Sequence, residues 1–263
     1  MSRPGFVFSV LRIELKLGLK YRTELLLSTT YLIFPMVIYF FMWANIYGHG
    51  GQMGDYSLKA ILTYYLVSLI LYGTMPIFAT SEISNSIKDG RLTYFLTRPI
   101  SHFGYFLSSV FGMTVVWFIS NVIGMSALIL LMKKHLLIPS AGCLIQGLVF
   151  YFIGFGVAFI SGYLLQLSAF WFGDSTGISM LWDWVIGFAG GAIIPLDVLN
   201  FRLFDYLPFK YIYFLPAQAL MGRITSDRFV PELVTGIAWI ILLRIAAVLV
   251  WNAGLKRYEA PGG

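Results

Sequence analysis

Residues 81–101, with the sequence SEISNSIKDGRLTYFLTRPIS, form a long polar run between two strongly apolar segments. Ile83 and Ile87 are one helical turn apart, so a helix would place both side chains on one face. Gly90 would end that helix, and a second apolar face would then be formed by Leu92, Phe95 and Leu96. The sequence therefore predicts two short amphipathic helices in a loop that leaves the membrane and presses against another surface. A topogenic loop that packs on the chain's own spans is the alternative.

The composition identifies the broad class of the protein. The chain has 263 residues, of which 59% are hydrophobic and 11% are charged, and its mean hydropathy is +0.80. Soluble domains carry about 25% charged residues, so a polytopic membrane protein fits better. The 18 Lys and Arg residues exceed the 12 acidic residues, but they are scattered among apolar spans. Membrane orientation explains this excess better than nucleic acid binding does.

Six apolar segments are each near the ~20 residues that cross a hydrocarbon core. They predict an all-α membrane protein with spans at residues 25–47, 58–80, 103–132, 142–168, 177–197 and 232–253. Pro35 and Pro76 would kink the first two spans. In the fourth span, Gly154, Ala158 and Gly162 recur at a spacing that allows close approach of another helix.

The predicted organisation is one transmembrane domain over residues 1–263. Its parts in chain order are an interfacial helix (1–24), two spans (25–80), the polar loop (81–101), three spans (102–197), an outer segment (198–231) and a last span with a tail (232–263).

The N-terminal region favours a helix in the membrane interface. In residues 6–22, the positions on one face are Ser9, Arg12, Lys16 and Lys20, and those on the other are Phe6, Val10, Ile13 and Leu17. A basic flank that only fixes topology is the alternative. Basic residues are more numerous on the side that would hold both termini and the 81–101 loop. We therefore expect these three parts to be cytoplasmic.

The segment after the fifth span suits neither a solvated loop nor another span. Gly187, Gly190 and Gly191 precede Pro195, and aromatic, proline and charged residues then alternate over residues 197–229. This mixture predicts a re-entrant or interfacial helical segment on the outer side.

The sequence contains no sign of catalytic chemistry. It has no G-x-x-x-x-G-K-[ST] phosphate loop and no G-x-S-x-G serine motif. His49, His102 and His135 fall in three different predicted loops, so they are not expected to share a metal ion. We therefore expect no catalytic residue, no metal site and no enzyme activity in this chain.

Two ionisable residues fall within predicted spans, where charge is costly and commonly functional. Asp183 is flanked by Trp182 and Trp184, and Arg244 lies near the middle of the last span. One interpretation is a structural ion pair between Asp183 and Arg244. The other is that the Trp-Asp-Trp group faces a pathway and receives a cationic or aromatic substrate.

The predicted arrangement resembles the permease subunit of type-2 ABC exporters. The 81–101 loop is similar to that family's E…G-x-L…L-x-x-P-[IV]-S signature, carried here by Glu82, Gly90, Leu92, Leu96, Pro99, Ile100 and Ser101. The outer segment resembles the family's G…P-L loop, carried here by Gly191, Pro195 and Leu196.

The resemblance implies a division of labour between subunits. Two permease subunits, in a homodimer or a heterodimer, would form the path in the cell membrane, and two separate ATPase subunits would bind ATP and Mg. The chain itself would need no cofactor. The coupling residues would be Glu82, Ile83, Ile87, Gly90, Leu92 and Arg98, and the basic helix would pack beside them, with Glu82 pairing with Arg12 or Lys16.

The resemblance also favours export of small amphipathic or drug-like compounds. Two other classes stay open at this point. One is a self-contained secondary transporter or channel, although such proteins commonly carry inverted repeats that we do not detect here. The other is a membrane scaffold that anchors an ATPase without moving a solute.

Overall fold

The computed structural model describes the following parts of the chain: residues 9–10, 12–14, 16–17, 20, 22–76, 81–173, 175–199 and 201–258. These residues form helices and irregular connections, with no β-strand among them, so the predicted all-α class is confirmed. Three predicted segments lie partly outside the described residues. They are the interfacial helix over 6–22, the end of the second span (77–80) and the end of the C-terminal tail (259–263).

Six helices correspond to the predicted spans: α2 (Arg22–Gly48), α3 (Leu58–Tyr72), α6 (His102–Met132), α7 (Ala141–Gln166), α9 (Thr176–Ala189) and α12 (Ser226–Leu255). Shorter helices connect them: α4 (Ser81–Lys88), α5 (Leu92–Leu96), η1 (Lys133–His135), α8 (Ala169–Phe172), α10 (Leu203–Tyr206), η2 (Pro208–Tyr211) and α11 (Phe214–Leu220).

Four of the described helices, α2, α6, α7 and α12, are long and apolar enough to cross a membrane. The apolar helices α3 and α9 have only 15 and 14 residues. At about 1.5 Å per residue, each reaches roughly 22 Å, against about 30 Å for a hydrocarbon core. The count of six spans therefore stays a prediction.

The end of α3 corrects one expectation. The helix stops at Tyr72, and the amide of Gly73 donates to the carbonyl of Leu69 at 3.0 Å. Asn121 of α6 donates to the carbonyl of Gly73 at 3.0 Å, and Pro76, which has no amide hydrogen, follows soon after. Pro76 therefore does not kink a continuing helix, because the helix has already ended.

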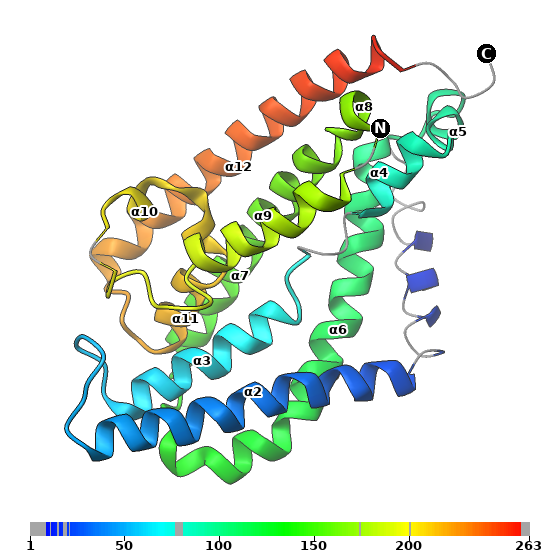
Figure 1. Ribbon diagram of the computed structural model, residues 1–263. Coiled ribbons are helices and arrows are strands. Elements are labelled where there is room, and N and C mark those ends of the chain that lie inside the picture. The colour runs from blue at the N-terminus through cyan, green and yellow to red at the C-terminus, as the bar shows by residue number, and fades with distance from the viewer. Residues whose placement is uncertain are drawn as a thin grey trace.

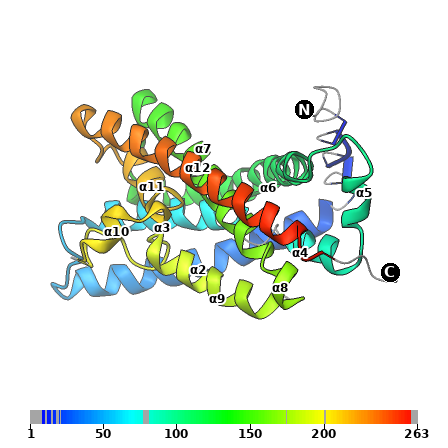
Figure 2. The same ribbon diagram turned by 90° about the horizontal axis from the view of Figure 1, so that it is seen from above.

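The helix α7 is the centre of the bundle. More than half of its membrane-crossing stretch is buried, whereas less than a fifth is buried in the three other long helices. It packs against α11, η2, α9 and α12, and Figures 1 and 2 show α12 running alongside it. The other helices are therefore arranged around α7.

A close approach of backbones joins α7 to the segment after α9. A Cβ atom added at Gly154 would lie 2.1 Å from the carbonyl oxygen of Tyr211 in η2. Ala158 and Gly162, on the same face, are buried as well. At Gly154, α7 therefore meets the backbone of η2 and of the residue that follows it, and residues 211–213 are fully buried.

Three segments meet at one end of the bundle. The Thr93 hydroxyl oxygen of α5 lies 3.5 Å from the Tyr258 hydroxyl oxygen just after α12. Ser109, near the start of α6, donates to Glu14 at 2.6 Å. Figure 1 shows α4, α5 and the end of α12 at this end, with α10 and the α2–α3 connection at the other. This placement agrees with the common side predicted for these segments.

The close approach at Gly154 generates a stability prediction. Gly154→Ala is expected to lower the melting temperature of the purified protein in detergent, because overpacking commonly costs about 1–3 kcal/mol. Gly142→Ala is the matched control on the exposed first turn of α7, where the nearest atom to an added Cβ is 3.8 Å away. Equal melting temperatures for the two variants would contradict the close contact.

Candidate functional site

A cavity of about 490 Å³, called here the aromatic pocket, lies between α2, α3 and α9. Its wall is mainly aromatic and includes Tyr31, Tyr39, Tyr65, Tyr72 and Trp184, with the carboxylate of Asp183. The rings of Tyr39 and Tyr65 stack with their centroids 4.3 Å apart. Small-molecule sites commonly have volumes of about 300–1,000 Å³, so this pocket is large enough for a drug-sized ligand.

Asp183 is the charged group of the aromatic pocket. Its side chain is half-buried, and among the described residues no basic side chain forms an ion pair with it. Trp184 beside it is 71% exposed at the rim, whereas Trp182 faces away, with its ring 5.4 Å from that of Phe209. An unpaired carboxylate among aromatic rings attracts a cation through charge and cation–π interaction.

Arg244 lies in a different place. Its guanidinium carbon is 4.0 Å from the ring centroid of Phe103, the second residue of α6. It lines a separate cavity together with His102 and Tyr163. The ion pair between Asp183 and Arg244, one of the two interpretations of the sequence, is therefore not formed. Arg244 therefore lies beside the first turn of α6.

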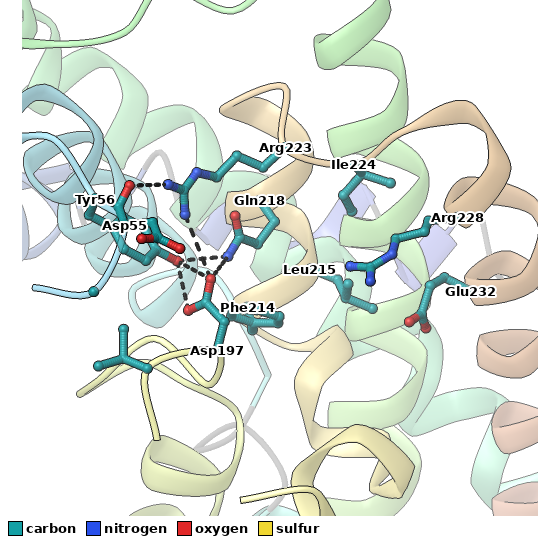
Figure 3. Close-up of a pocket in the computed structure, with 12 residues that line it drawn as sticks. Asp55, Tyr56, Asp197, Phe214, Leu215, Gln218, Arg223, Ile224, Arg228 and Glu232 are labelled. Carbon is teal, nitrogen blue, oxygen red and sulfur yellow. Dashed lines mark hydrogen bonds and ion pairs between the residues drawn. The ribbon is translucent and has the colours of Figure 1, made fainter. Parts of the chain in front are cut away.

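The opposite end of the bundle carries a polar group called here the Tyr56 cluster, made of Tyr56, Asp197, Gln218 and Arg223 (Figure 3). The Tyr56 hydroxyl donates to the carboxylate of Asp197, whose two oxygens are each 2.9 Å away. Gln218 donates to the Tyr56 hydroxyl at 2.7 Å and to Asp197 at 3.0 Å. The Arg223 guanidinium lies 3.9 Å from the Tyr56 ring centroid and 3.6 Å from Asp197.

Burial, and then the adjacent charge of Asp197, raise the pKa of Tyr56, so its hydroxyl keeps the proton that it donates. The cluster borders a cavity of about 400 Å³ and joins the α2–α3 connection to α11 and to the loop after α9. Sequence reasoning missed these residues, because Tyr56 lies 141 positions from Asp197 and 162 from Gln218. No local pattern could have paired them.

The predicted outer-loop residues Gly191 and Pro195 lie in the connection after α9. Gly191 has a φ of +87°, a conformation that glycine adopts readily. The hydroxyl of Tyr64 donates to the carbonyl of Gly191, and that of Tyr65 donates to the carbonyl of Ile193 at 3.0 Å. Pro195 is buried. These contacts fasten the loop to α3 beside the aromatic pocket.

The apolar face of the 81–101 loop is turned inward. Ile83 and Leu92 have no exposed surface, and Ile87 is 5% exposed. They belong to the core that includes α7, and α4 packs on α7 and α8. The expectation that Ile83 and Ile87 present a face to a partner protein therefore needs correction. They attach the loop to the chain's own helices.

The opposite face of the same loop is exposed and polar. Gly90, with a φ of +75°, separates α4 from α5. Glu82 pairs with Arg91 at 3.2 Å and forms no ion pair with Arg12 or Lys16, which are both described and exposed. The accessible residues of α5 and the turn after it include Tyr94, Leu96 and Arg98. The Arg98 guanidinium lies over the Tyr94 ring at 4.0 Å and donates to the Tyr94 hydroxyl at 2.8 Å.

Residues 33–262 match the family described as ABC-2 family transporter protein. The chain belongs to this family. The match extends over nearly all of the described residues, from within α2 through the 81–101 loop to the end of α12. No curated protein and no solved structure matches the chain.

Membership makes the chain a multi-pass membrane permease of an ABC transporter, in agreement with its long apolar helices. Permeases of this family generally work with ABC ATPase partners. Membership of the family therefore implies a membrane subunit without an ATPase site of its own. The predicted family is therefore confirmed. The individual roles of the motif residues in the permease stay predictions.

The Tyr56 cluster generates a second stability prediction. Tyr56→Phe keeps the ring under Arg223 but removes the hydroxyl shared by buried Gln218 and the exposed carboxylate of Asp197. The loss of a hydrogen-bond partner at a buried polar group typically costs about 1–3 kcal/mol. We expect a lower melting temperature for the purified permease in detergent. Tyr206→Phe is the control, because Tyr206 is 74% exposed on α10. If Tyr206→Phe lowers the melting temperature as much as Tyr56→Phe does, the Tyr56 cluster does not stabilise its end of the bundle.

Proposed function

We propose that the permease is the membrane subunit of an ATP-driven exporter of small amphipathic or drug-like compounds, coupled to separate ATPase subunits through the 81–101 loop. The proposed substrate class is supported by the aromatic pocket, a drug-sized cavity with an unpaired carboxylate. Membership of the ABC-2 transporter family supports the general function as a permease of an ABC transporter.

A six-span arrangement with cytoplasmic termini is part of this proposal. The 81–101 loop lies at the opposite end of the bundle from the α2–α3 connection (Figure 1). The chain from Leu58 to Ser81, which begins with α3, is therefore proposed to cross the membrane once. The same holds for α9, which runs from α8 to the loop that contacts the Tyr56 cluster. Local thinning of the bilayer accommodates helices of this length at modest cost.

The exposed face of α5 is proposed to dock the ATPase. Tyr94 and Leu96 are 45% and 50% exposed, and Arg98 extends beside them. The buried residues Ile83 and Ile87 hold α4 on α7 and α8, so a push on α5 would be passed to the helices behind it. The loop would then act as a rigid coupling element in an alternation of access.

A second permease subunit, either the same chain or a related one, is proposed to complete the path. The rim of the aromatic pocket exposes Tyr31 by 68% and Trp184 by 71%. Large aromatic side chains of this kind are common in the centres of protein interfaces. A partner placed against α2 and α9 would enclose the pocket between two subunits.

The coupling proposal is tested by charge reversal. Arg98→Glu is expected to reduce the amount of ATPase subunit that co-purifies by roughly tenfold, since opposed charges across an interface become like charges. Its melting temperature should stay unchanged, because the side chain is exposed. Ile87→Asp should instead destabilise the permease itself, since it buries an unpaired charge.

Arg202→Glu is the control for Arg98→Glu, because it reverses the charge of an exposed residue at the other end of the bundle. Normal co-purification with Arg98→Glu would place the docking surface elsewhere. An absence of any co-purifying ATPase with the unaltered permease, together with transport that needs no ATP, would favour a secondary transporter or a scaffold.

The pocket proposal is tested by removing its charge. Asp183→Asn is expected to raise the half-saturating concentration of tetraphenylphosphonium, a lipophilic cation, by roughly tenfold in ATP-driven vesicle transport, from a loss of about 1–2 kcal/mol. Asp205→Asn, on exposed α10 outside the pocket, is the control. A neutral amphipathic substrate should be affected little. Equal effects on both substrates would argue against a charge-selective pocket.

A further inference from the structure

We propose that the cavity around Arg244 binds the headgroup of an anionic phospholipid and that the bound lipid ties the 81–101 loop to α12. This cavity has a volume of about 370 Å³ and is separate from the aromatic pocket. Its lining includes Phe95, Leu96, His102, Phe103, Arg244 and Val248. The proposal goes beyond transport and depends only on the location of the permease in a membrane.

The charge in this cavity is unbalanced. Among the described residues, no carboxylate forms an ion pair with Arg244, whose side chain is half-buried over Phe103. The other titratable groups facing it are His102 and Tyr163. The two ring nitrogens of His102 lie 3.0 Å from the Ser86 hydroxyl and 3.1 Å from the Tyr163 hydroxyl, so they are already engaged. An anionic ligand would supply the missing partner, and a guanidinium suits a phosphate.

The position of the cavity points to a lipid as the source of the phosphate. Ser101 caps α6 by accepting a hydrogen bond from the amide of Gly104 at 3.2 Å, so α6 begins here, directly after the polar loop. On α12, the residues around Arg244 form an exposed apolar surface that includes Ile241, Ile245, Val248 and Leu249. Acyl chains would lie along this surface with the headgroup at Arg244. Basic pockets between helices at a membrane boundary commonly bind anionic headgroups.

Among the elements that line the cavity, α5 and α12 are distant in sequence. Phe95 and Leu96 come from α5, and Arg244 and Val248 come from α12. The hydrogen bond between His102 and Ser86 extends the wall to α4. A lipid bound here contacts both sides, so its presence would favour the docked position of the loop.

The test uses full-length permease in lipid nanodiscs of phosphatidylcholine, with and without added phosphatidylglycerol. Native mass spectrometry measures which lipid the protein retains, and thermal unfolding measures its effect on stability. We expect preferential retention of phosphatidylglycerol and a higher melting temperature in its presence. Arg244→Met keeps the packing of the side-chain stem and should lose roughly fivefold of this preference, as one basic group is worth about 1 kcal/mol near anionic lipid.

Three further variants make the test specific. Arg244→Lys keeps the charge and should keep most of the preference, and Arg202→Met removes an exposed charge at the opposite end and should keep all of it. Val248→Trp narrows the cavity while Arg244 stays intact, and it should lose the preference for phosphatidylglycerol. This variant tests the proposal if Arg244→Met does not fold. The proposal is overturned if Arg244→Met or Val248→Trp retains the full preference. It is also overturned if inorganic phosphate in phosphatidylcholine discs raises the melting temperature as much as phosphatidylglycerol does.

Discussion

The contact between Gly154 and the backbone of Tyr211 is the constraint on which the arrangement of the permease depends. It brings η2 and α11 against the central helix and buries the tyrosines there. The amide of Phe214, the first residue of α11, then donates to the carbonyl of Gly190 at 3.0 Å, which fixes the loop after α9. That loop is held to α3 by tyrosine hydroxyls, and the aromatic pocket is formed between these same elements.

Hydropathy and local signals were sufficient for the all-α class and for most helix positions, because both depend on short stretches of sequence. The periodicity of Ile83 and Ile87 likewise identified an apolar face in the 81–101 loop. It could not identify what covers that face. Burial depends on the placement of α7 and α8, which follow more than fifty positions later in the chain. The apolar face of the loop is therefore covered by the chain's own helices, where a partner protein was expected.

The candidate site shows the same limit. Asp183 could be singled out from the sequence, because a charge among apolar residues is costly wherever the helix packs. The tyrosines opposite it come from α2 and α3, and only the fold brings these helices and α9 around one cavity. In the sequence, Arg244 lies near the middle of the last predicted span. Its contact with Phe103 at the start of α6 shows that helices of unequal length need not share a midpoint.

The early end of α3 has a mechanical consequence. Because α3 stops at Tyr72, no continuous helix joins it to α4, whereas the side chains of α4 are embedded in the core that includes α7. A displacement of α4 therefore reaches the centre of the bundle through side-chain packing, and not through a helix continuous with α3. The pocket wall contributed by α3 is thereby insulated from small movements at the loop, and only a shift of α7 large enough to carry η2 and α11 would reshape it.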